Sequence, residues 1–209
     1  SAKDINYPTF TELQFASFNK AAKSFGRAGF GNLVKHCAAT GAALISRKYH
    51  CDAVRIGIGF YGLWPSRELE VQLSKKIRLY PVLSWRAVVG EVKDLKPGDY
   101  VGYDLTERVK NKTKLAIIPV GYWHGFPRAL SGAGSVIING KKADVLGRVS
   151  MDLLAVDVGG VRCRPGDIAT IIGRDGKEEI LASDAARDAG TIHYELLTRL
   201  NPLIERVLV

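Results

Sequence analysis

The residues best suited to chemistry in the first third of the chain follow two short apolar segments. His36 precedes Thr40 by four positions. Arg55 precedes the alternating glycines Gly57 and Gly59. Glycines let backbone N–H groups approach an anion closely, and a hydroxyl just beyond a strand either caps a helix or binds a phosphate. Together these residues suggest an anion site. Taken singly, a helix cap, a structural histidine and a ligand-free strand end are the alternatives.

A second group of chemically capable residues, half of them tyrosines, is spread over the rest of the chain. A phenol can exchange a proton with a substrate, and charged side chains can bind or exclude charged molecules. Taken singly, these residues also fit ordinary sheet packing or a helix anchor. The ordered motifs described below single out Tyr103, Tyr122, Arg148, Met151, Asp152 and Tyr194.

The elements that must position the first group follow a βα pattern. Residues Thr9 to Glu12 match a capping box, and apolar residues then recur at helical spacing, which predicts a helix over residues 9–26. Short strands are expected at 33–36 and 53–56, with a helix at 40–46 between them. This alternation predicts parallel strands with helices outside them.

From residue 77 onward, strand signals alternate with turn signals. The Pro-Gly-Asp segments at 96–99 and 164–167, and the pairs Asn139-Gly140 and Asp175-Gly176, suit tight turns. They predict a mainly antiparallel β-barrel or sandwich. Strands are expected over residues 80–92, 115–120, 135–138, 153–158 and 168–172.

The end of the chain combines helix and strand signals. Ser183 is expected to cap a helix that reaches Ala189, and residues 194–200 should form a second helix. Residues 204–209 should form a closing strand.

A domain boundary is expected between Pro65 and Ile77, which divides the chain into domains of residues 1–70 and 71–209. The first domain holds too few βα units to close a (β/α)₈ barrel, so it is expected to be the last βα units of such a barrel. The expected fold class is therefore α/β plus all-β.

Composition narrows the function classes without naming a partner. The chain of 209 residues has a formal net charge of +9, but its lysines and arginines are spread from Lys3 to Arg206, which argues against a nucleic-acid footprint. Cys37, Cys51 and Cys163 fit neither a disulfide framework nor a C-x-x-C metal motif. No apolar run has membrane length, and the first four residues lack a signal-peptide core, so a cytoplasmic protein without nucleic-acid or membrane partners is expected.

Taken in order, the candidate segments resemble the pyridoxal-phosphate-dependent alanine racemases. His36, Thr40 and Arg55-x-Gly57-Ile58 are similar to the family's last barrel strands. The resemblance covers nearly all of this chain but only about the latter half of the family's length. Four later segments are similar to family motifs: Gly-Asp followed by a tyrosine and then a threonine at 98–106, Ile-Pro-x-Gly-Tyr at 118–122, Gly-Arg-x-x-Met-Asp at 147–152 and Thr-Ile-x-Tyr-Glu at 191–195.

The resemblance implies a cofactor role for each candidate in the first domain. Thr40 and the backbone at Gly57 and Ile58 would bind the phosphate of pyridoxal 5'-phosphate (PLP), and His36 would lie near the cofactor. Arg55 would contact the pyridine nitrogen. A guanidinium does not give up a proton, so that nitrogen would stay unprotonated and act as a weaker electron sink, which limits side reactions.

The same resemblance makes Tyr103 the catalytic tyrosine. Tyr122 would line the substrate entrance, and Tyr194 would reach the cofactor phosphate. The other residues implied at the substrate site and its entrance are Arg148, Met151 and Asp152.

The activity implied is interconversion of L-alanine and D-alanine by two bases that act on opposite faces of the substrate carbon. Tyr103 would be one base and would work across the interface of a homodimer. The other would be the lysine that attaches PLP, which has no identifiable counterpart in this sequence. Lys35 precedes His36 on an expected strand, so alternation points its side chain away from the cofactor. The missing N-terminal half of the barrel is therefore an expected partner, and this chain alone is expected to be inactive.

Two other function classes are open: a non-catalytic PLP-binding or dimerisation module, and a basic RNA-binding β-barrel. Serine or a broader range is the alternative to alanine as substrate. Three departures from the family pattern bear on the site. Ala39-Thr40 replaces Asn-Ser, Asp104 replaces the glycine after the catalytic tyrosine, and Trp123-His124 replaces Ala-Asp, which predicts a less negative entrance.

Overall fold

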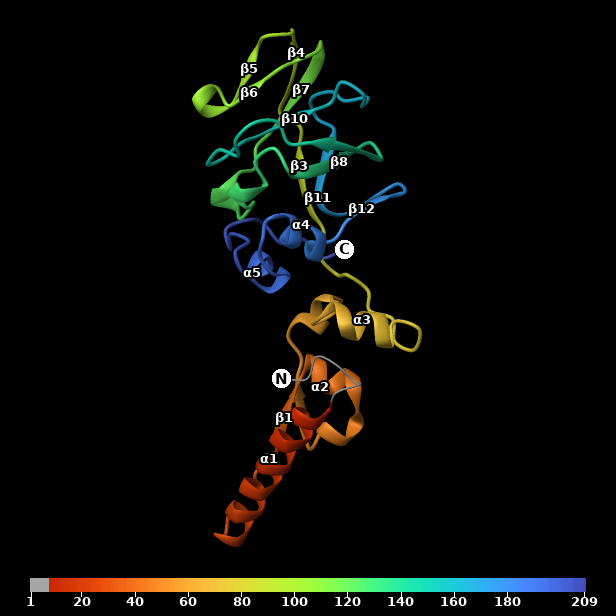
Figure 1. Ribbon diagram of the computed structural model, residues 1–209, viewed down its shortest axis with the longest axis vertical. Coiled ribbons are helices and arrows are strands. Elements are labelled where there is room, and N and C mark those ends of the chain that lie inside the picture. Colours follow the sequence, from red (N-terminus) through yellow and green to blue (C-terminus); the bar gives the residue numbers. More distant parts are fainter. Residues whose placement is uncertain (1–7) are drawn as a thin grey trace. The chain divides into compact units, whose positions relative to one another are not determined.

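The computed structural model describes residues 8–209, which form two compact units that divide between Val82 and Leu83 (Figure 1). This division lies beyond the range 65–77 in which the boundary was expected. The first residues of the expected N-terminal domain, and the Ser1 to Asp4 segment considered for a signal peptide, lie outside the described residues.

The first unit begins with helix α1 (Thr9–Arg27), which confirms the predicted helix to within one residue. The predicted capping box is wrong. Pro8 occupies the N-cap position without a side-chain cap bond. The Glu12 carboxylate instead accepts hydrogen bonds from Lys48 Nζ at 2.6 Å and from the Tyr49 hydroxyl. The ammonium brings a full positive charge to the carboxylate, which a backbone N–H at the helix start does not.

Two parallel strands follow, as the βα pattern predicts. Strand β1 (His36–Ala39) pairs with β2 (Ala53–Arg55). The short helix α2 (Thr40–Ile45) and then the 3₁₀ turn η1 (Arg47–Tyr49) connect the two strands. The first strand was predicted at 33–36 and begins three residues later. Residue 35 is held outside the strand because its N–H donates to the Asp52 carboxylate at 2.8 Å.

The rest of the first unit contains a 3₁₀ turn, η2 (Ile58–Tyr61), and helix α3 (Arg67–Leu73). Helix α3 was not predicted. Its start is marked by Ser66, whose hydroxyl accepts a hydrogen bond from the N–H of Leu69 at 3.3 Å. Leu69 and Leu73 are buried, so the helix packs through one apolar face.

The second unit contains antiparallel sheets, in agreement with the prediction. In one sheet, β7 (Thr113–Ile118) lies between β4 (Glu91–Leu95) and β10 (Leu154–Asp157). The other sheet has the order β12 (Glu178–Ile180), β11 (Ile168–Asp175), β8 (Ser135–Ile138) and β9 (Lys141–Asp144), and β3 (Trp85–Val88) also pairs with β11. Val136, Ile137 and Ile138 are all fully buried, so β8 is covered on both faces and forms the centre of the core.

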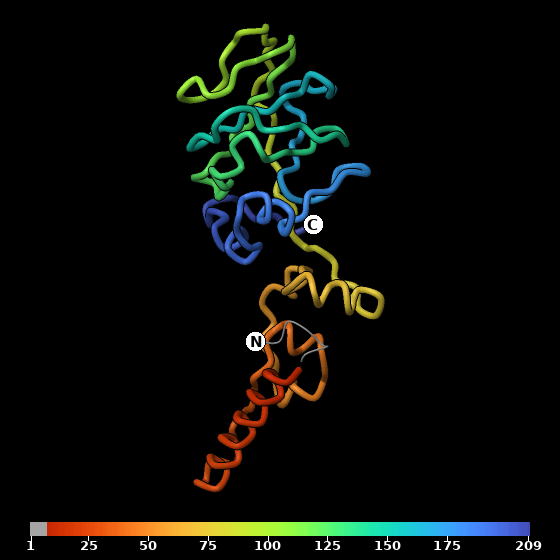
Figure 2. Tube along the Cα trace, viewed as in Figure 1, coloured from red at the N-terminus to blue at the C-terminus, as the bar shows by residue number. Residues whose placement is uncertain are grey.

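The predicted Asn139-Gly140 turn is confirmed and explains a strand that was missed. Both residues have positive φ, 49° and 72°, as a two-residue hairpin turn requires. The turn pairs Ile138 with Lys141 and so creates β9, whose polar sequence gives no strand signal of its own. The polar strand β12 was missed for the same reason, and the strand predicted at 80–92 is two strands, β3 and β4, separated at Val89 and Gly90. The hairpin of β5 (Tyr100–Val101) with β6 (Glu107–Arg108) was missed because each of its strands has only two residues. In Figure 2 that hairpin is the yellow-green loop.

Two helices, α4 (Ala182–Asp188) and α5 (His193–Thr198), confirm the predicted pair near the end of the chain. The cap assigned to Ser183 is wrong, because Leu181 is the N-cap and Ser183 already lies inside the helix. The closing strand at 204–209 is also wrong. The Arg206 guanidinium donates to the carbonyls of Ile204 and Asn201, and the last two residues are fully exposed, so no face of a sheet is available to this segment.

The cysteines are free thiols. Burial, and to a lesser degree the neighbouring Cys51 thiol, raises the pKa of Cys37 above its ordinary value. Within residues 8–209, no helix is both long and apolar enough to cross a membrane. In the same range, His, Cys, Asp and Glu side chains form no group of three or more that would hold a metal ion.

Alkaline unfolding should report on the contact between α1 and Tyr49. The hydrogen bond to Glu12, followed by burial, raises the pKa of Tyr49 from 10.0 to about 12. Between these pH values the phenol ionises in the unfolded chain but not in the folded one, so the stability that it contributes below pH 10 should be lost as the pH rises to 12. Urea unfolding across this range, together with tyrosinate absorbance, measures both effects. Tyr49→Phe should remove the late-ionising phenol, whereas Tyr100→Phe, at an exposed ring, should not. If a phenol with a pKa of about 12 still titrated in Tyr49→Phe, this pKa would not belong to Tyr49.

Candidate functional site

The end of β2 is tied to β1 by one guanidinium. Arg55 Nη1 lies 2.7 Å from Nδ1 of His36 and donates to the His36 carbonyl at 3.1 Å. Arg55 Nη2 donates to the Cys37 carbonyl at 3.2 Å. A guanidinium can only donate, so His36 Nδ1 is an acceptor and the neutral ring carries its proton on Nε2. In the parallel register His36 lies beside Ala53 and Ala39 beside Arg55, so the Arg55 side chain reaches back along β1 to contact His36.

Thr40 occupies the start of α2 and is 5 % exposed. It does not cap the helix. Its hydroxyl oxygen instead accepts hydrogen bonds from the N–H of Gly57 at 3.2 Å and of Gly59 at 3.4 Å. Ile58 lies between these glycines at the first position of η2, where an N–H has no acceptor within the helix. The structure therefore brings together five of the predicted residues, His36, Thr40, Arg55, Gly57 and Ile58.

Thr40, Gly57, Ile58 and Gly59 form a cluster that we call the cradle. Its two glycines differ in the space around them. A Cβ atom on Gly59 would lie 2.5 Å from Cγ2 of Thr40, so the absence of a side chain permits close contact between η2 and α2. A Cβ atom on Gly57 would meet nothing within 4 Å. Gly57 therefore borders open space, and a small group can approach its backbone. Lys35 does not enter the cradle: its ammonium lies 3.8 Å from the Asp52 carboxylate, and its side chain is half exposed.

In the second unit, three motif segments meet backbone to backbone. A Cβ atom on Gly147 would lie 2.6 Å from the carbonyl oxygen of Val101, and one on Gly121 would lie 2.2 Å from that of Ser150. The N–H of Tyr122 donates to the Ser150 carbonyl at 3.0 Å, which fixes the same contact. Only glycine permits these approaches, so segments 101–104, 121–123 and 147–152 lie together.

Four of the five predicted site residues in these segments are exposed, and Arg148 is half-buried. The exposed fractions of Tyr103, Tyr122 and Met151 are 66 %, 44 % and 52 %. Asp152 is exposed as well. Arg148 Nη1 donates to the carboxylate of Asp104, the residue after Tyr103. The sequence motifs thus converge into one exposed surface of tyrosines, a methionine and an ion pair.

His124, where the family pattern has an acidic residue, is built into the backbone of this surface. Its Nδ1 accepts a hydrogen bond from the N–H of Gly121 at 3.2 Å, and its carbonyl accepts one from the N–H of Asn201. The ring therefore closes the turn at Gly121, a role that the sequence did not indicate.

Tyr194, the sixth predicted cofactor residue, lies in α5 of the second unit. Burial raises the pKa of its phenol above the ordinary value, so the hydroxyl holds its proton and can serve as a hydrogen-bond donor. The helix start is stabilised by a hydrogen bond from the Thr191 hydroxyl to the Glu195 carboxylate.

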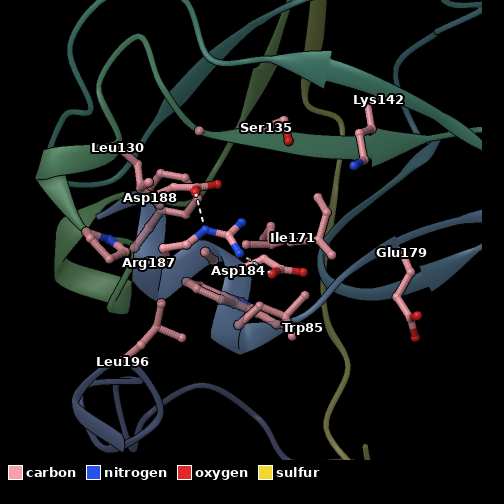
Figure 3. Close-up of a pocket in the computed structure, with 16 residues that line it drawn as sticks. Trp85, Leu130, Ser135, Lys142, Ile171, Glu179, Asp184, Arg187, Asp188 and Leu196 are labelled. Carbon is pink, nitrogen blue, oxygen red and sulfur yellow. Dashed lines mark hydrogen bonds and ion pairs between the residues drawn. The ribbon is translucent and has the colours of Figure 1, made fainter. Parts of the chain in front are cut away.

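A cavity of about 150 Å³ also lies within the second unit (Figure 3). Its apolar lining includes Trp85, Leu130 and Leu196. Arg187 lies across it and donates to Asp184 at 2.9 Å and to Asp188 at 3.3 Å. None of the predicted site residues lines this cavity, so it is distinct from the surface around Tyr103.

Sequence reasoning missed the residues that hold the site in shape. Gly59, Gly121 and Gly147 act by close approach, and a glycine in one sequence does not reveal which backbone lies opposite it. Asp104 was noted only as a departure from the family pattern, although its carboxylate binds Arg148. Its position directly after a candidate tyrosine was the only available signal.

An α/β unit with a hydroxyl and glycine cradle, followed by an antiparallel unit that exposes tyrosines, is an arrangement suited to an enzyme that binds a small molecule. Residues 1–65 match the family model "Alanine racemase, N-terminal domain", and residues 82–208 match "Alanine racemase, C-terminal domain". The chain belongs to the alanine racemase family, which consists of isomerases.

Individual proteins agree with the family models. The chain is 37 % identical to an alanine racemase of Leptospira interrogans over 100 % of its own length and 55 % of that protein's length. A crystal structure of alanine racemase from Bacillus anthracis with bound L-Ala-P is similar with a TM-score of 0.86 and 33 % identity, over 93 % of this chain and 49 % of that one. A Bartonella henselae alanine racemase with covalently bound pyridoxal phosphate is similar with a TM-score of 0.73 and 29 % identity, over 92 % of this chain and 52 % of that one. The chain thus spans about half the length of these relatives.

The contact between Gly59 and Thr40 gives a stability prediction. Gly59→Ala should lower the free energy of unfolding by about 1–3 kcal/mol, because the new methyl group overlaps Cγ2 of Thr40. Thr40→Ser removes that carbon and keeps the hydroxyl, so the double variant should recover most of the loss. Urea unfolding followed by circular dichroism measures both. Gly57→Ala is the matched control, since its Cβ would meet no atom within 4 Å. Equal losses in Gly57→Ala and Gly59→Ala would refute this explanation.

Proposed function

We propose that this chain supplies the cofactor cradle and the tyrosine base of an enzyme that interconverts L-alanine and D-alanine with PLP. The observation that carries the proposal is a pair of hydrogen bonds. Arg55 donates to His36, and in the adjoining cradle the N–H of Gly57 donates to Thr40. The relatives that match the whole chain are named alanine racemases.

The cradle fits the phosphate of PLP. The Thr40 oxygen accepts two N–H groups, so its own hydrogen is left to donate to a phosphate oxygen. The bonds from Gly57 and Gly59 are longer than the usual ~2.9–3.0 Å, so an anion can compete for these donors. The open space at Gly57 leaves room for the ligand, and Ile58 adds an N–H at the start of η2.

The Arg55 and His36 pair fits the ring of the cofactor. Three acceptors hold the guanidinium in a fixed orientation, yet it has five N–H donors, so it can also donate to a pyridine nitrogen. PLP, when bound, withdraws electrons from the substrate and makes its Cα proton easier to remove. Because Arg55 cannot lose a proton, it would donate a hydrogen bond to an unprotonated ring nitrogen and so would moderate that withdrawal.

Tyr103 is proposed as the base on one face of the substrate carbon. Its side chain is exposed, and its segment contacts the 147–152 segment, which in turn contacts the Tyr122 segment, so a substrate can reach this surface. Arg148 and Asp152 would set the charge around this approach. The base on the opposite face, and the covalent attachment of PLP, are assigned to a lysine outside this chain, since Lys35 is engaged with Asp52.

The proposed assembly follows from these roles. The first unit would be the last βα units of a (β/α)₈ barrel, which the preceding half of the barrel completes, and the second unit would be the β domain. Tyr194 would add its protonated hydroxyl to the phosphate site. Tyr103 would serve the neighbouring subunit of a homodimer.

Reconstitution tests this function. The chain alone should show no racemisation of L-alanine, and joining it to the preceding half of the barrel should restore it. In the joined protein, Tyr103→Phe should lower kcat roughly 10²- to 10⁴-fold, the usual contribution of one acid–base group. Tyr100→Phe, at an exposed ring in the same hairpin, is the control. Turnover by the chain alone, abolished by Tyr103→Phe, would contradict the division of roles. PLP binding without turnover in the joined protein would favour a non-catalytic module.

Cofactor affinity tests the cradle separately from turnover. Gly57→Ala should fold normally but weaken PLP binding about tenfold or more, because its methyl group would enter the space beside the phosphate donors. Titration of the joined protein with PLP, followed by cofactor absorbance, measures the dissociation constant. Gly160→Ala, whose Cβ would also meet nothing within 4 Å, is the control. An unchanged dissociation constant in Gly57→Ala would exclude this cradle as the phosphate site.

A further inference from the structure

The loop that carries Tyr103 has an unusual backbone. Asp104 has a φ of 62° and Leu105 a φ of 52°, so two consecutive residues with side chains adopt the left-handed conformation. This conformation is unfavourable for such residues, although aspartate tolerates it better than most. Such a loop requires contacts elsewhere to keep its shape.

Packing of the tyrosine does not supply these contacts. The Tyr103 ring is 66 % exposed, and Leu105 is 65 % exposed. Inside the loop, the Thr106 hydroxyl donates to the Tyr103 carbonyl at 3.4 Å, which is a long and weak bond. The contacts that fix the loop therefore lie outside it.

Arg148 contacts the loop on both sides of Tyr103. On the preceding side, the backbone of Arg148 lies so close to Gly102 that a Cβ atom there would be 3.2 Å from the Arg148 nitrogen. On the following side, the Arg148 guanidinium donates to the Asp104 carboxylate. One residue thus holds the neighbour before the tyrosine with its main chain and the neighbour after it with its side chain.

We propose that the ion pair between Asp104 and Arg148 is a positioning device for Tyr103. It stabilises the left-handed turn and fixes where the phenol leaves the backbone. Because the ring has little packing of its own, its direction depends on the backbone that the pair holds. The proposal rests on the proposed function in one respect, since it takes Tyr103 as the base.

Salt and a charge-removing variant separate the ion pair from the fold. In the chain itself, Asp104→Asn keeps a side chain that tolerates positive φ but removes the charge. The amides of residues 102–106 should then exchange with deuterium about threefold faster, as expected for a partly exposed ion pair. Sodium chloride at 1 M should accelerate exchange in the unmodified chain and have little effect on Asp104→Asn. Arg148→Lys should fall between the two, because it keeps the charge but loses the planar fork.

The matched control is Glu91→Gln. Glu91 forms an exposed ion pair with Lys93 at 3.1 Å in the same unit but outside the three motif segments, so its loss should leave exchange at 102–106 unchanged. Unchanged exchange in Asp104→Asn would overturn the proposal. So would equal acceleration by Glu91→Gln, because the effect would then be general to the unit.

Kinetics of the joined protein decide whether the loop positions the base. Asp104→Asn should lower kcat about threefold or more with KM nearly unchanged, and 1 M salt should lower kcat of the unmodified enzyme but not of the variant. Faster exchange with an unchanged kcat would overturn the link to Tyr103. If the unmodified joined protein bound PLP but did not racemise alanine, the proposed function would be wrong and the positioning role would fall with it. The exchange data would then describe only a structural ion pair.

Discussion

The arrangement of the first unit depends on the hydrogen bonds of Arg55. This side chain links β2 to β1 by donating to the His36 ring and to the carbonyls of His36 and Cys37. A lysine cannot do this, because its single ammonium group lacks the planar fork that reaches ring and backbone acceptors together. The same contacts determine the tautomer of His36. The chemistry of this link is thus set by an interaction within the protein, before any ligand binds.

The second unit positions its candidate residues by a different physical interaction. Here the constraint is steric: Gly121 and Gly147 let three segments meet at distances that any side chain would prevent. The buried strand β8 supplies a rigid centre, and the exposed residues lie on loops around it. Residues distant in sequence are therefore brought together by backbone contact, and the side chains of Tyr103, Tyr122 and Met151 remain exposed.

This difference explains what the sequence could predict. The helix at 9–26, the parallel strands, the strand at 135–138 and the Asn139-Gly140 turn follow from periodicity and turn chemistry, which are local. Strands β9 and β12 are polar and exist because the buried strands β8 and β11 pair with them, so local pattern could not predict them. The capping-box prediction failed because the Glu12 carboxylate binds the ammonium of Lys48, 36 residues away, and not the backbone at the start of the helix. The candidate residues were identified from ordered motifs, but their contacts, such as that of Asp104 with Arg148, depend on tertiary structure.

The exposure of the second site is itself informative. Tyr103, Tyr122 and Met151 are large side chains with exposed fractions between 44 % and 66 %, and the segments that carry them meet through their backbones. A clustered exposed group of this kind is typical of a surface that contacts another molecule. In the first unit, by contrast, Thr40 is buried and Arg55 is already bonded to three acceptors. One unit therefore carries groups that internal hydrogen bonds orient, and the other carries groups that are exposed. This contrast supports an enzyme in which Tyr103 acts against a surface that a second subunit provides.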